Sequence, residues 1–173
     1  MPERDGGVRT SQRYTRHFGW AYAGLAELEG RASSFLAQGL SRGERLMYVA
    51  DDPNVKRWPE LFLERGDLVV LGTTEVYGSD RLVDPAAQRA TFEAALVESL
   101  QEGYTGMRVL ADNTSLVDGP LRLAAWLRWE DEAERFMAEN PVIGLCAFDD
   151  TRIEPDVLHA VLGAHRVIAP PVP

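Results

Sequence analysis

The sequence predicts an α/β protein of three layers, in which a mainly parallel sheet is covered by helices on both faces. Three observations predict this class. Apolar segments of strand length alternate with helical patterns along the chain. These segments are apolar at nearly every position, as are strands that are buried on both faces of a parallel sheet. Three of them end abruptly in acidic residues, which is typical of the carboxyl edge of such a sheet.

Each predicted element follows from a local pattern. Helices begin at pairs such as Asp84-Pro85 and stop at residues such as Gly103, because Asp caps a helix, Pro fits its first turn and Gly ends it. Strands are predicted at residues 18–22, 44–50, 67–71, 107–111, 142–148 and 165–168, with 107–111 as the central strand. Helices are predicted at 25–40, 55–63, 85–102, 120–139 and from 155 onward, with a loop at 75–84.

Length and composition predict one globular domain. The chain has 173 residues, of which 45% are hydrophobic and 26% are charged. This is enough for a core that needs no disulfide or metal to hold it together. No internal repeat or linker divides the sequence, so we expect a single domain at 16–169 between an N-terminal tail at 1–15 and a C-terminal tail at 170–173.

The charge balance and the single cysteine exclude several classes. Acidic residues number 27 against 18 basic ones, giving a net charge of -9, so neither nucleic acid nor an anionic membrane is expected as a direct partner. No apolar run approaches the roughly 20 residues that span a bilayer, and we expect a cytoplasmic protein. Cys146 can form no disulfide within the chain, and one cysteine with three scattered histidines is a poor basis for a zinc site. No metal and no cofactor are therefore predicted.

Acidic residues follow three of the predicted strands, as Asp51-Asp52, Asp112 and Asp149-Asp150. Carboxylates gathered at one sheet edge can bind Mg²⁺, act as acid and base, or accept hydrogen bonds from a ligand. The alternative is that each caps the helix that follows. We favour caps for Asp51-Asp52 and Asp149-Asp150. Asp112 lacks that explanation, because its helix starts several residues later, near Pro120.

Two segments, 43–52 and 108–115, are similar in layout to the recombinase-type ATPases of the RecA/KaiC class, in which the strand ending in Asp is the Walker B strand. Such an ATPase needs a Gly-rich loop with Lys and Ser/Thr after the first strand, so that backbone N–H groups and an ammonium hold the phosphates. The matching stretch, 23–31, has no Gly-Lys-Ser/Thr and carries Glu27 and Glu29 instead. We therefore expect a RecA-like fold without a functional phosphate loop, and no ATP hydrolysis by the usual mechanism.

The whole pattern from His17 to Ile168 resembles the MEDS domain, the sensory domain of methanogen and methylotroph regulators of the DcmR type. Short matches in the family's order carry the resemblance: His17 with Tyr22 five places on, then 35–40, 42–45, 48–51, Tyr77, 102–109, Trp129-Glu130 and 145–149. The resemblance implies a degenerate RecA-like fold that senses a small, largely apolar organic ligand. It also implies a regulatory partner, since such domains occur with response-regulator, DNA-binding or STAS/anti-sigma modules. Phe148 and Trp129 depart from the family by replacing tyrosines.

We expect the ligand at the carboxyl ends of the strands. The predicted ligand-binding residues are His17, Trp20, Tyr22, Asp51, Tyr77, Asp112, Trp129, Glu130 and Phe148. Three of them have an alternative role without a ligand. His17 could be a histidine at a strand start whose ring is hydrogen-bonded within the protein, and Tyr77 could be a surface aromatic instead of a lid. Glu130 could be a solvated glutamate. Composition alone favours the solvated Glu130. Cys146, in an apolar strand, is interpreted as an inert buried hydrophobe.

The function predicted from the sequence is a non-catalytic sensory domain. It would bind a small organic ligand and signal through a separate regulatory protein of the STAS/anti-sigma or response-regulator type, since the sequence contains no such module itself. One alternative is a nucleotide binder or Mg²⁺-dependent enzyme that uses Asp51, Asp112 and Asp149. Another is a structural interaction protein, such as a homo-oligomer, whose crevice is filled with side chains.

Overall fold

The computed structural model describes residues 16–52, 62, 66–165 and 167–168. Its sheet has six strands in the order β3-β2-β4-β5-β1-β6, and every pair of neighbours is parallel. The strands are β1 (His17–Tyr22), β2 (Arg45–Ala50), β3 (Leu68–Gly72), β4 (Met107–Asp112), β5 (Val142–Asp149) and β6 (Val167–Ile168). The predicted parallel sheet is confirmed, and β4 lies in its interior as expected.

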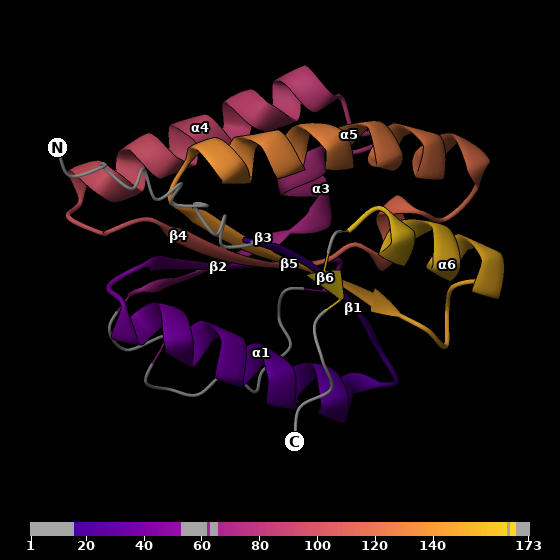
Figure 1. Ribbon diagram of the computed structural model, residues 1–173, viewed down its shortest axis with the longest axis horizontal. Helices are drawn as coiled ribbons and strands as arrows, with labels where there is room; N and C mark the ends of the chain where they lie inside the picture. Colours follow the sequence, from indigo (N-terminus) through magenta and orange to yellow (C-terminus); the bar gives the residue numbers. More distant parts are fainter. Residues whose placement is uncertain (1–15, 53–61, 63–65, 166, 169–173) are drawn as a thin grey trace, which may run out of the picture.

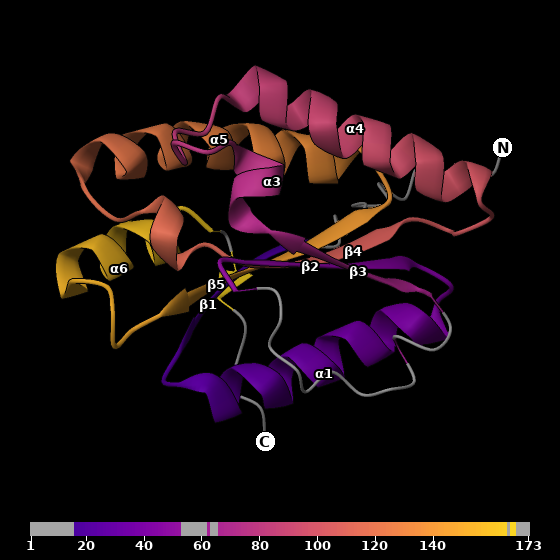
Figure 2. The same ribbon diagram turned by 180° about the vertical axis from the view of Figure 1, so that it is seen from behind.

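Helices cover both faces of the sheet, so the predicted three layers are also confirmed. The helix α1 (Leu25–Ser41) lies on one face, and the two views in Figure 1 and Figure 2 agree that the four other labelled helices lie on the opposite face. These are α3 (Thr73–Tyr77), α4 (Pro85–Gln101), α5 (Pro120–Glu139) and α6 (Pro155–Gly163). A short 3₁₀ turn, η1 (Thr114–Leu116), follows β4.

Each face of the sheet has its own core. Leu36, Leu110 and Leu145 belong to the core beneath α1, whereas Trp126 and Phe136 belong to the core beneath α4 and α5. Successive side chains of a strand point to opposite faces. In β1, therefore, Trp20 and Tyr22 pack on the α1 side, while His17 and Gly19 face α5 and α6.

Most element boundaries agree with the prediction to within a few residues. The predicted loop at 75–84 differs, because its first residues are helical. Glu75 explains this start, since its carboxylate accepts a hydrogen bond from the Gly72 N–H at 2.5 Å and so caps α3. The predicted final strand is shorter than expected, and His165 lies before it.

The predicted helix at 55–63 and both predicted tails lie almost wholly outside the described residues. Phe62, which is described, is helical and buried at 3% exposure. Among the helices that the structure describes, none combines the length and the apolar character needed to cross a membrane.

Candidate functional site

The carboxyl edge of the sheet carries a hollow of about 220 Å³, where the fold class places ligand sites. The tips of four strands and the first turn of α1 form it. Its lining residues are Tyr22, Leu25, Leu28, Tyr48, Ala50, Asp51, Asp52, Asp112, Asp149 and Arg152. The hollow thus combines an apolar floor with four carboxylates and one guanidinium.

Asp112 organises this edge. One carboxylate oxygen accepts a hydrogen bond from the Tyr22 hydroxyl at 2.8 Å, and the other accepts from the backbone N–H and the hydroxyl of Thr114 at 3.1 and 2.6 Å. Burial, followed by the negative charge of Asp112, raises the pKa of both Tyr22 and Tyr48 well above the ordinary value. Both tyrosines therefore stay neutral and present hydroxyl groups.

A second hollow of about 350 Å³ adjoins the first and shares Asp51 and Arg152 with it. The Asp51 carboxylate accepts from the Ser115 hydroxyl at 2.7 Å and lies 3.5 Å from the Arg81 guanidinium. The helix that Asp51-Asp52 was predicted to cap lies outside the described residues. The predicted cap is wrong for Asp149, whose carboxylate accepts from the N–H and hydroxyl of Thr151 rather than from α6.

In the turn between β1 and α1, a glutamate side chain already binds a backbone N–H group. Backbone N–H groups at a helix start attract anions, which is how a phosphate loop works. Here the Ala23 N–H already donates to the Glu27 carboxylate at 2.8 Å. The negative charge of Glu27 therefore lies at this turn, where it disfavours a phosphate.

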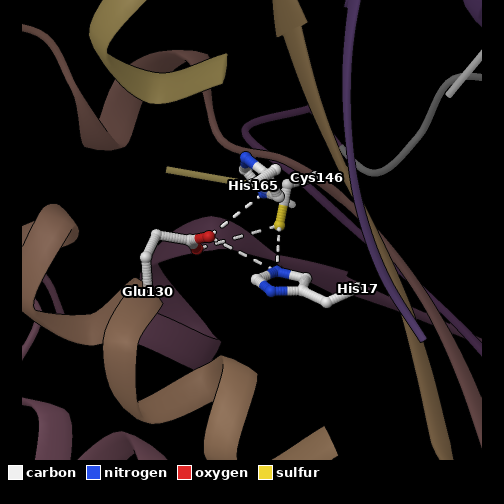
Figure 3. Close-up of side chains that lie close together, drawn as sticks. All are labelled: His17, Glu130, Cys146 and His165. Atoms are coloured by element: carbon white, nitrogen blue, oxygen red, sulfur yellow. Dashed lines mark hydrogen bonds and ion pairs between the residues drawn. The ribbon is translucent and has the colours of Figure 1, made fainter. Parts of the chain in front are cut away.

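Beneath α5, on the opposite face of the sheet, four side chains converge in the core. His17 begins β1, Cys146 lies within β5, Glu130 lies mid-way along α5 and His165 follows α6 (Figure 3). All four are buried, at 2%, 8%, 3% and 7% exposure respectively. Their ligand atoms lie within 4.8 Å of one another.

The distances within this cluster are short. The Nε2 atom of His17 lies 3.3 Å from the Cys146 sulfur and 3.4 Å from the Glu130 carboxylate. Glu130 also lies 3.1 Å from Nε2 of His165 and 3.9 Å from the sulfur. On its other side, Nδ1 of His17 lies 3.3 Å from the carboxylate of Glu134, one helical turn beyond Glu130.

Burial and the carboxylates set the protonation of the cluster. Burial alone would lower the pKa of His17, but Glu130 and Glu134 outweigh it and raise that pKa above the ordinary value. Burial, with Glu130 beside it, raises the pKa of the Cys146 thiol well above its usual range. A thiol next to an imidazole resembles an activated nucleophile, but this thiol is protonated and enclosed. Neither hollow at the carboxyl edge includes it.

The structure divides the predicted ligand site into two places. Tyr22, Asp51 and Asp112 line the first hollow, and Trp20 packs against Tyr22 at a ring distance of 5.4 Å. His17 and Glu130 lie in the buried cluster, so the solvated interpretation of Glu130 is wrong.

Three predicted aromatics are core residues on the cluster's side of the sheet. Tyr77 is 7% exposed within α3 and therefore does not form a lid in a loop. Trp129 stacks on Phe92 at 5.8 Å, and Phe148 is fully buried. Their role in ligand binding stays a prediction.

Sequence reasoning missed two members of the cluster. Cys146 is buried as predicted, but it contacts His17 and Glu130 and is not surrounded by apolar atoms alone. The sequence pattern predicts a strand at His165 and indicates no role for it. A signal for the site was present in α5, where Glu130 and Glu134 share a helix face with the buried Trp126.

Comparison with known proteins found one family. The family model described as the methanogen/methylotroph, DcmR sensory domain, MEDS, matches residues 16–166. A search of curated proteins and a search of solved structures each found no match, so the expected RecA likeness stays a prediction. The match covers nearly all of the described residues, including both the carboxyl-edge hollow and the buried cluster. The chain therefore belongs to the MEDS family of sensory domains.

Proposed function

We propose that this chain is a non-catalytic sensory domain that binds a small organic molecule in the hollow at the carboxyl edge and signals through a separate protein. The hollow itself carries the proposal, because it lies where the ligands of open α/β sheets bind and is lined by apolar, hydroxyl and carboxylate groups. Membership of a sensory family supports it.

The size and lining of the hollow define the ligand class. A volume of about 220 Å³ exceeds the roughly 150 Å³ that holds benzene in an apolar cavity and falls short of the roughly 300 Å³ at which drug-sized sites begin. Leu25, Leu28 and Ala50 suit a small apolar body. Four carboxylates against one guanidinium favour a head group that donates hydrogen bonds or carries positive charge.

Two observations support a sensor over a nucleotide binder or a Mg²⁺-dependent enzyme. Glu27 binds the Ala23 N–H in the turn before α1, and the surrounding carboxylates repel a triphosphate. Both oxygens of Asp112 already accept hydrogen bonds, from Tyr22 and Thr114, which leaves less of the carboxylate for a hard cation. A hollow at the crevice also favours ligand binding over a purely structural protein.

The signalling route is proposed from the position of the hollow. A ligand there would touch the tips of β1, β2, β4 and β5 and the first turn of α1 at once. Binding would order groups that now meet water and so present an altered edge to a partner. From the family resemblance, we expect that partner to be a regulator of the STAS/anti-sigma or response-regulator type.

The test is an NMR titration of the ¹⁵N-labelled chain with three ligands that share one carbon skeleton: n-butylamine, 1-butanol and butyrate. We expect the amine to bind most tightly and butyrate most weakly, with shifts that map to Tyr22, Tyr48 and Asp112. Asp112→Asn should weaken the amine several-fold, whereas Asp131→Asn, which removes an exposed carboxylate on α5, should not. The proposal is wrong if butyrate binds best or if the shifts map elsewhere.

A further inference from the structure

We propose that His17, Glu130, Cys146 and His165 form a binding site for one divalent transition-metal ion of the zinc class (Figure 3). The four side chains come from four separate elements and offer two imidazole nitrogens, one sulfur and one carboxylate. These are the atom types that bind Zn²⁺ in proteins. The site lies on the opposite face of the sheet from most of the carboxyl-edge hollow and does not rest on the function proposed for that hollow.

The spacing of the donor atoms fits a single ion. Donors placed about 2.0–2.3 Å from a tetrahedral zinc ion lie roughly 3.3–3.6 Å from one another. Sulfur to Nε2 of His17 is 3.3 Å, Glu130 to the same nitrogen is 3.4 Å, and Glu130 to Nε2 of His165 is 3.1 Å. The remaining separations stay within 4.8 Å, so small side-chain rotations would complete the tetrahedron.

One contact brings two hydrogen-bond acceptors together when His165 is neutral. The Nδ1 atom of His165 lies 2.9 Å from the Val161 carbonyl, which makes Nδ1 the natural position of its proton. Nε2 then presents a lone pair to a carboxylate oxygen of Glu130 at 3.1 Å. Neither atom makes a hydrogen bond within the part of the chain that the structure describes. Two buried acceptors that face each other repel, and a metal ion between them would turn the repulsion into two bonds.

The surroundings orient the donors as a metal site requires. Ligand histidines commonly use their second nitrogen to donate to a carboxylate or a backbone carbonyl, which fixes the ring. His17 has Glu134 in this position and His165 has Val161. Gly19 makes room for the second ring, because a Cβ there would lie 2.6 Å from Nδ1 of His165.

Charge balance favours a divalent ion. With the metal bound, Cys146 would be a thiolate, Glu130 a carboxylate and both imidazoles neutral, so two negative charges would meet two positive ones in a buried site. Binding releases the thiol proton to solvent. Sulfur and imidazole ligands favour zinc over magnesium or calcium, which prefer oxygen. Four protein donors leave no open position, so the ion would connect β1, β5, α5 and the segment after α6 without catalysing a reaction.

The experiment is to prepare the full chain free of metal and titrate it with Co²⁺ and then Zn²⁺. We expect one Co²⁺ per chain with the visible bands of a tetrahedral ion and a sulfur-to-cobalt charge-transfer band, both lost when Zn²⁺ displaces it. Zn²⁺ should also raise Tm. His165→Gln and Cys146→Ser should each weaken binding by more than the roughly 10–100-fold typical of losing a supporting residue. His159→Gln, which replaces the exposed third histidine, is the matched control and should bind as the unaltered chain does.

Three results would overturn the site. The first is that, with Zn²⁺ added, the folded and unaltered chain shows the mass of the metal-free protein in native mass spectrometry and an unchanged Tm. The second is Co²⁺ bound with an octahedral spectrum and no sulfur band. The third is unchanged affinity in both ligand variants. If a ligand variant fails to fold, the titration of the unaltered chain still decides.

Discussion

Tyr22 and His17 lie in the same short strand, yet their side chains meet opposite surroundings. Tyr22 faces α1 at the carboxyl edge, where its hydroxyl donates to Asp112 beside a hollow bordered by the exposed Asp51 and Asp52. His17 faces α5 and packs against Glu130 and Cys146 with 2% of its surface exposed. On one face of the sheet, the carboxylates thus lie at a solvent-accessible edge. On the other face, the carboxylate of Glu130 lies deep in a core.

The two regions also satisfy their polar groups differently. At the edge, Asp112 and Asp149 each bind the hydroxyl and N–H of a threonine two residues later, so much of the hydrogen bonding is local. In the buried cluster, the contact between His17 and Cys146 joins residues 129 positions apart. A local turn can form early and survive substitutions around it. The cluster exists only when the whole sheet and α5 are in place.

The largest expected effect of a single substitution is at the aromatic cover of the cluster. Trp126 is fully buried and packs edge-on against Phe148 at 5.3 Å and near His165 at 5.9 Å. Trp126→Ala should lower the free energy of unfolding by about 3–5 kcal/mol, because it removes a large side chain from a packed core. Urea unfolding measures this change.

Leu121→Ala on the same helix is the control, since Leu121 is 77% exposed. It should change the free energy of unfolding by less than about 0.5 kcal/mol. Equal losses in the two variants would mean that Trp126 does not lie in a packed core on the cluster's side of the sheet.

Glycine-to-alanine substitutions should have opposite effects in β1, facing α5 and α6, and in α1 on the other side of the sheet. Gly19→Ala should destabilise the protein by about 1–3 kcal/mol, since its Cβ would meet the His165 ring at 2.6 Å. Gly30→Ala should instead stabilise it by about 0.5–1 kcal/mol, because Gly30 lies within α1 with nothing within 4 Å of the added atom. Thermal unfolding of both variants gives the signs. Two changes of the same sign would contradict this difference between the faces.

How far the sequence could predict this molecule depends on the range of each contact. Strands, helices and the carboxyl edge were predictable, because apolar runs, Asp-Pro starts and acidic tips are local patterns. The hydrogen bonds of Asp112 also lie within reach of such reasoning, since Thr114 is two residues away. The strand pattern itself assigns His17 and Tyr22 to opposite faces, so the sequence does not support one site around both. Residues five apart in a strand point to opposite faces, because the side-chain period is two.

The buried cluster could not be predicted in the same way. It requires that β1 lies beside β5, which brings Gly19 and Cys146 into register, and that the chain after α6 returns over β1. No local pattern fixes that strand order. Cys146 and His165 each look ordinary in their own segment, and only the tertiary fold makes them neighbours of Glu130.

A smaller effect is expected at the edge, where the hydroxyl of Thr114 joins two strand tips. It donates to Asp112 at 2.6 Å and accepts from the Asp149 N–H at 3.0 Å, and Thr114 is buried. Thr114→Val keeps the shape and removes both bonds, which should cost about 1–2 kcal/mol in urea unfolding. Thr151→Val, at an exposed hydroxyl that also bonds a carboxylate, should cost less than about 0.5 kcal/mol. Similar costs would show that the edge is as exposed at Thr114 as at Thr151.

The smallest expected effect is at Tyr22, at the carboxyl edge, where it depends on pH. Tyr22→Phe removes one hydroxyl bonded to Asp112 and should cost about 1 kcal/mol at neutral pH. Burial, then Asp112 and Asp149, raises the pKa of Tyr22 in the folded state above the value of about 10 expected when unfolded. The stability that Tyr22 contributes is therefore fully present below about pH 10 and is lost as pH rises toward the folded-state pKa. Urea unfolding between about pH 8 and pH 11 should show the unaltered chain losing stability more steeply than Tyr22→Phe, so that the two curves converge. Parallel curves would mean that the Tyr22 hydroxyl is no more shielded than one in water.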